Sequence, residues 1–144
     1  MIEQDTIKLL RECDAGIKMG VSSIDEVLEY VRADRLKNYL ADCKDEHEEL
    51  RIEIQKLLDK YHDDGKEPNP IAKGMSWMKT NVKLGMDMSD GTIADLITDG
   101  CNMGVKSLNK YLNQYEAADD ESKKLCNKLI AIEEELCRDL KEYL

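Results

Sequence analysis

The feature that most constrains the fold is the recurrence of apolar residues at alternating steps of three and four along four long stretches of the chain. This spacing places the apolar residues of a stretch on one face of an α-helix, so each stretch predicts an amphipathic helix with one buried stripe. The stripes are, in chain order, Leu10, Cys13, Ile17, Gly20, Ile24, Val27 and Val31; Leu36, Leu40, Cys43, His47, Leu50, Ile54, Leu57 and Tyr61; Ile93, Ile97, Cys101, Gly104, Leu108, Tyr111 and Tyr115; and Leu125, Leu129, Ile132, Leu136, Leu140 and Tyr143.

Turn-forming residues separate these stripes. The first helix is predicted over residues 2–32 and the second over 34–62, after which residues 63–70 combine turn formers with Pro70, a residue that often begins a helix. Residues 71–86 predict an extra helical segment, and Ser89 or Asp90 can cap the helix that follows. The sequence therefore predicts an all-α fold, an antiparallel four-helix bundle with an extra helical segment between bundle helices two and three, in a single domain of residues 1–144.

Charge and cysteine content restrict the partners and the compartment. The net charge is -10, and such a surface repels phosphate backbones and anionic lipid heads, so we expect no nucleic-acid partner and no membrane. No apolar run approaches the roughly 20 residues of a membrane helix. The five cysteines have no zinc-ribbon spacing and no signal peptide is recognisable, which predicts reduced thiols in a cytoplasmic protein.

One histidine stands where an aliphatic side chain would pack better. His47 lies in the second stripe, and Cys43 precedes it by four residues on the same helix face. Cys13 on the first helix, Cys101 on the third, and Glu133 or Cys137 on the fourth lie on or beside the corresponding inner faces. Thiolate and imidazole ligands suit zinc or iron, so Cys43, His47, Cys101 and Glu133 are the candidate metal ligands.

The competing interpretation of the same residues is ordinary packing. Free cysteine behaves as a small buried hydrophobe, and a core histidine can bond to a neighbouring carboxylate or carbonyl. The acidic residues around His47 are expected to form a solvated helix face, and Gly16 and Gly20 to permit close approach of a neighbouring helix. The sequence contains no phosphate-binding loop and no hydrolase motif, so it supports no ordinary enzyme class and identifies no cofactor.

Several motifs in this order resemble a bacterial family of uncharacterised, ferritin-like four-helix-bundle proteins of the domain-of-unknown-function type. They are Asp14, Gly16, the loop Lys66, Glu67, Pro68, Asn69, Pro70, then Gly74, Trp77, Met78, Lys79, and finally Gly100, Val105, Lys106 and Tyr111. The resemblance covers nearly the whole chain and implies a ferritin-like fold. None of these motifs is a catalytic signature.

The chain departs from the di-metal carboxylate proteins, which take a Glu from two helices and a Glu-x-x-His from each of the other two. Lys44 stands three residues before His47, and the fourth helix offers Glu134 followed by Cys137. The sequence is therefore compatible with two functions. We expect a non-enzymatic structural or protein-interaction module that forms a homodimer or binds a protein partner through the methionine-rich segment 71–86; the alternative is a metal-binding or redox-active bundle with a divergent core site.

Overall fold

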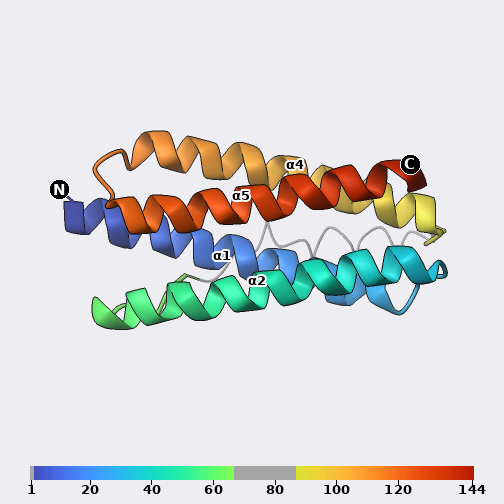
Figure 1. Cartoon of the computed structure of the whole chain (residues 1–144), viewed down its shortest axis with the longest axis horizontal. Helices are drawn as coiled ribbons and strands as arrows, with labels where there is room; N and C mark the ends of the chain where they lie inside the picture. Colours follow the sequence, from blue (N-terminus) through green and yellow to red (C-terminus); the bar gives the residue numbers. More distant parts are fainter. Residues whose placement is uncertain (1, 67–86) are drawn as a thin grey trace.

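The computed structural model describes residues 2–66 and 87–144, and within them the chain is helical without a strand. The long helices are α1 (Ile2–Leu28), α2 (Asp34–Lys60), α4 (Asp90–Gln114) and α5 (Asp120–Leu140), and the short 3-10 helix η1 (Lys141–Tyr143) ends the chain. Figure 1 shows the four long helices lying side by side along the long axis of the molecule. The fold class is thus confirmed as an all-helical bundle. The segment predicted over 71–86 lies outside the described residues.

The helix boundaries follow local capping chemistry. The Ser89 side chain accepts a hydrogen bond from the Thr92 amide at 3.2 Å, and Asp119 accepts one from the Ser122 amide at 2.8 Å. These bonds satisfy amides that a helix start leaves free. Of the two predicted caps for α4, Ser89 is therefore the one used.

The first helix is shorter than predicted. It ends at Leu28 instead of residue 32, because the Asp90 carboxylate accepts the amides of Arg32 and Ala33 at 2.8 and 2.9 Å. Those amides are therefore drawn into the turn before α2 and do not continue α1. The second helix ends at Lys60, and His62 beyond it adopts a positive φ of 59°.

Two clusters of buried residues fill the core. The first combines the start of α1 and α5 with the end of α2 and α4, through residues such as Leu10, Ile54, Leu108 and Leu129. The second combines the end of α1 and α5 with the start of α2 and α4, through Ile24, Leu40, Ile97 and Leu136 among others. The end of α2 and the start of α4 consequently belong to different clusters, at opposite ends of the bundle.

At two stripe positions the neighbouring residue is buried in place of the predicted one. Leu58 is fully buried while Leu57 is only partly buried, and Ile132 is half-buried while Glu133 beside it is 6 % exposed. A helix repeats every 3.6 residues, so a stripe of three-and-four steps can shift by one residue over several turns. In α5 this shift brings a carboxylate into the core.

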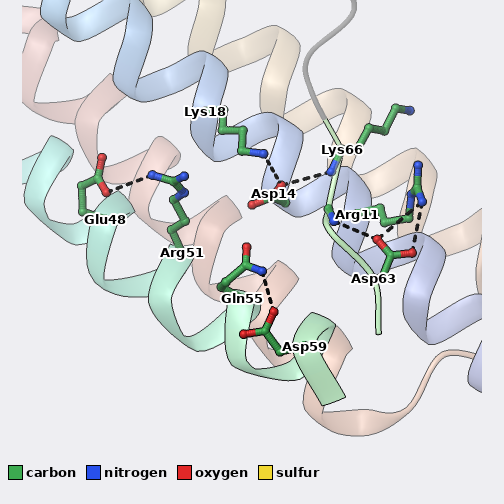
Figure 2. Close-up of polar contacts among 10 residues, drawn as sticks. Arg11, Asp14, Lys18, Glu48, Arg51, Gln55, Asp59, Asp63 and Lys66 are labelled. Atoms are coloured by element: carbon green, nitrogen blue, oxygen red, sulfur yellow. Dashed lines mark hydrogen bonds and ion pairs between the residues drawn. The ribbon is translucent and has the colours of Figure 1, made fainter. Parts of the chain in front are cut away.

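Polar side chains of α1 hold two connections in place. Figure 2 shows Arg11 binding the Asp63 carboxylate, at 3.1 Å, and Asp14 accepting from both the Lys66 amide at 3.1 Å and the Lys18 ammonium at 2.8 Å. These contacts fix the segment after α2 against α1. At the other connection, Asp5 and Thr6 accept amides of the turn between α4 and α5.

Candidate functional site

One polar layer separates the two core clusters, and each long helix contributes one residue to it. Along α2, His47 lies between Cys43 of the second cluster and Leu50 of the first. Glu133 holds the corresponding place on α5. On α1 and α4 the residues that face this pair are Gly20 and Gly104. We call these four residues the central layer.

The His47 ring is buried and held by its own helix. Only 2 % of the residue is exposed, and Nδ1 lies 2.8 Å from the Cys43 carbonyl oxygen and 3.5 Å from the Cys43 Sγ. A carbonyl can only accept, so Nδ1 carries a proton and donates it. The other ring nitrogen, Nε2, points to Glu133 and lies 3.8 Å from its Oε1.

The two glycines leave the volume that the two polar side chains fill. A Cβ added at Gly20 would stand 3.0 Å from the His47 Nε2, and one at Gly104 would stand 3.0 Å from the Glu133 Cδ and closer still to Oε2. Real Cβ atoms essentially never come closer than 3.0 Å to another atom, so a side chain at Gly104 would have to displace the Glu133 carboxylate. A side chain at Gly20 would make an unusually tight contact, and the His47 ring would have to shift by a few tenths of an ångström.

The pair binds one proton tightly. Burial by itself would lower the pKa of His47, but hydrogen bonding to Cys43 and the nearby Glu133 carboxylate together outweigh it and raise that pKa to about 10. Burial also raises the pKa of Glu133, although His47 opposes this rise. The imidazole therefore keeps its second proton, on Nε2, to a higher pH in the folded protein than it would in water.

The remaining predicted ligands lie at the edge of the central layer. The Cys43 Sγ is on the Nδ1 side of the imidazole ring, away from Glu133. Cys101 stands one turn before Gly104 on α4, is 8 % exposed, and interacts with Cys137 and with Glu133, both of which raise its pKa. The structure thus brings His47 and Glu133 face to face and places Cys43 and Cys101 on their flanks.

The candidate metal ligands do not converge on one point. Within residues 2–66 and 87–144, no group of three or more His, Cys, Asp or Glu side chains is arranged around a common ion position. The His47 Nε2 and the Glu133 Oε2 have no hydrogen-bond partner. The four-ligand metal site therefore stays a prediction.

The outer surface near this layer is acidic. As expected, Asp45, Glu46 and Glu49 are exposed, and a shallow groove between α2 and α5 is lined by glutamates together with Lys128. Burial raises the pKa of Glu46, as does Glu135 across the groove. His47 and Glu133 do not line this groove, so the polar layer and the acidic surface are separate features.

Sequence reasoning did not identify the two glycines of the central layer as its partners. Gly20 was expected to admit a neighbouring helix, yet the atom nearest to its position belongs to a side chain, that of His47. Gly104 stands in the predicted stripe of the third helix. A glycine at such a stripe position leaves room for a large side chain of a facing helix, and this was the signal in the sequence that could have pointed to Glu133. On α4, Gly104 is the residue that lies against the Glu133 carboxylate.

Comparison with known proteins gives no relative, since no protein-family model, no curated protein and no solved structure matches the chain. Among the described residues, no helix has the length and apolar character needed to cross a membrane.

Proposed function

We propose that the chain is a ferritin-like, antiparallel helical scaffold of the cytoplasm that serves as a structural or protein-interaction module and catalyses no reaction. The composition of the two core clusters supports the antiparallel arrangement. The first cluster contains the end of α4 and the start of α5, and the second contains the end of α1 and the start of α2, so the two helices of each pair run in opposite directions. A long connection between the second and third bundle helices is also typical of ferritin-like bundles.

The central layer carries this proposal. In a bundle that performs chemistry, inward polar side chains surround a space for an ion or a substrate. Here the backbones of Gly20 and Gly104 lie directly against the His47 ring and the Glu133 carboxylate. The pair fills the space it lines, so it serves the bundle as a fixed polar contact between α2 and α5.

Such a contact suits a scaffold for a physical reason. A buried ion pair adds little net stability, but it penalises every packing that separates the partners. His47 and Glu133 meet only when α2 and α5 have one rotation and one register. We propose that the layer selects this single arrangement and so fixes the outer surface that a partner recognises.

The second candidate is a metal-binding bundle, and one observation favours it. The His47 Nδ1 donates to a backbone carbonyl, as metal-binding histidines usually do, which leaves Nε2 directed at Glu133 without a hydrogen bond. An ion between Nε2 and the carboxylate would need further ligands, for which Cys43 and Cys101 are nearest.

Metal analysis separates the two candidates. The protein is purified without chelator, its metal content is measured, and its melting temperature is recorded before and after treatment with EDTA. The scaffold proposal predicts less than stoichiometric metal and an unchanged melting temperature. A decrease of several degrees with EDTA, restored by zinc or iron but not by magnesium and absent in His47→Gln, would establish the metal-binding candidate instead.

A further inference from the structure

Two thiols of unequal exposure lie together where α4 packs on α5. Cys101 is 8 % exposed and belongs to the second core cluster, while Cys137 packs against that cluster from a partly exposed position. The Cys137 Sγ lies 3.7 Å from the Oδ1 of Asn102, the residue that follows Cys101. The side chain of Cys137 thus reaches α4 at the turn that carries Cys101.

The two thiols differ in exposure. The side chains of Cys137 and Cys101 are in hydrogen-bonding contact with each other, and Cys137 is partly exposed whereas only 8 % of Cys101 is exposed. The thiolate is the reactive form of cysteine, and an oxidant reacts first with a thiol that it can reach. Cys137 is therefore the thiol of this pair that an oxidant in solution can reach, and Cys101 is a buried thiol held beside it.

The other cysteines lack this combination. Cys13 and Cys126 interact with each other in the first core cluster, but both are fully buried. Cys43 is 5 % exposed and its nearest polar neighbour is the His47 ring. An accessible thiol beside a buried second thiol is the arrangement found in redox-sensing cysteine pairs.

We infer that Cys101 and Cys137 form a reversible disulfide when the protein meets a hydroperoxide. The Cys137 thiolate attacks one peroxide oxygen, the O–O bond breaks, and hydroxide leaves with the bonding electron pair, so that Cys137 becomes a sulfenic acid. The Cys101 sulfur then attacks the Cys137 sulfur, the S–O bond of the sulfenic acid breaks, and the hydroxide that leaves takes the Cys101 proton to give water. The two sulfurs are oxidised, the peroxide is reduced, and a thiol reductant reverses the bond by exchange.

This disulfide adds a redox response to a protein for which we propose only a structural role. It would join α4 to α5 one helical turn beyond Glu133, next to the central layer. The two helices would then be linked covalently at the point where the second core cluster begins.

The test uses the full chain and hydrogen peroxide. After exposure, free thiols are blocked with iodoacetamide in denaturant, and peptides are mapped by mass spectrometry without reduction. We expect two of the five thiols to resist alkylation, a cross-linked peptide pair containing Cys101 and Cys137, and recovery of all five thiols with dithiothreitol. In Cys101→Ser, dimedone should label Cys137 as a stable sulfenic acid adduct.

Cys126→Ala serves as the matched control, since it removes a thiol of the other pair and should leave the cross-link unchanged. Full alkylation of all five thiols after peroxide would overturn the inference, as would a cross-link that joins Cys13 to Cys126 or two separate chains. The peptide map of the unaltered protein decides the matter even if a variant folds poorly.

Discussion

A buried imidazole destabilises a helical bundle unless both of its nitrogens are accommodated. For His47 the Cys43 carbonyl accommodates one nitrogen at 2.8 Å, and Glu133 faces the other. Leucine would have packed at this position without any such requirement. A histidine at this position therefore depends on both the Cys43 carbonyl and the Glu133 carboxylate being in place.

Replacing His47 by leucine should therefore destabilise the protein, by about 2 to 5 kcal/mol, because Glu133 would remain buried without its partner. The change would be close to neutral only if Glu133 were solvated, and this condition is not met because Glu133 is 6 % exposed. Urea denaturation measures the difference.

Two further variants show whether the loss of stability in His47→Leu comes from the unpaired Glu133 carboxylate. The double replacement His47→Leu with Glu133→Met removes both polar groups and should be more stable than His47→Leu alone. Glu46→Gln on the exposed face of the same helix should change the unfolding free energy by less than about 0.5 kcal/mol. A single variant as stable as the unaltered protein would show that the pair is not coupled.

At the scale of the elements, the side chain that begins one helix also organises the start of another. Asp90 is the first residue of α4, and its two carboxylate oxygens accept the amides of Arg32 and Ala33 just before α2. The capping role of this region was predictable from sequence, since Ser89 and Asp90 stand at a helix start. The contact 57 or 58 residues away was not, because it depends on how the helices are placed.

We expect Asp90→Ala to destabilise the protein by about 1 to 2 kcal/mol, because two amides lose a charged acceptor at the turn between α1 and α2. Asp95→Ala, on the exposed side of the same helix, is the matched control and should have little effect. Amide hydrogen exchange should show faster exchange at Arg32 and Ala33 in Asp90→Ala alone. Unchanged protection of these amides would refute the contact.

At the scale of the whole molecule, the proton of the central layer makes stability depend on pH. The folded pKa of His47, about 10, exceeds the roughly 6.5 of an unfolded histidine, so its stabilisation is complete below about pH 6.5 and is lost as pH rises toward 10. The raised pKa of Glu133 acts in the same direction.

The unfolding free energy should accordingly fall between about pH 6.5 and 8.5, with a slope of at most about 1.4 kcal/mol per pH unit for one proton. In Glu133→Gln the slope should flatten or reverse, because burial then lowers the pKa of an unpaired His47. A flat profile in the unaltered protein would contradict the assignment.

Much of the helical architecture could be predicted from the chain alone. The three-and-four spacing identified the four long helices and put His47 inside, because periodicity reports which residues of one helix share a face. It does not report how that face is rotated against the other helices. The pairing of His47 with Gly20, and of Glu133 with Gly104, depends on this rotation and became visible only in the folded arrangement.

The close fit between Glu133 and Gly104 is the central claim, and a double-mutant cycle in EDTA-treated protein tests it most directly. Gly104→Ala should cost about 1 to 3 kcal/mol in the unaltered protein, since its Cβ would stand 3.0 Å from the Glu133 Cδ. At Gly100, where nothing lies within 4 Å, the same change should stabilise α4 by up to about 1 kcal/mol.

In a Glu133→Ala background the obstacle is gone, so Gly104→Ala should become as favourable as Gly100→Ala, a coupling of more than about 1 kcal/mol between the two positions. Equal effects of Gly104→Ala in both backgrounds would mean that the carboxylate does not occupy the glycine's space, and the account of the central layer would be wrong.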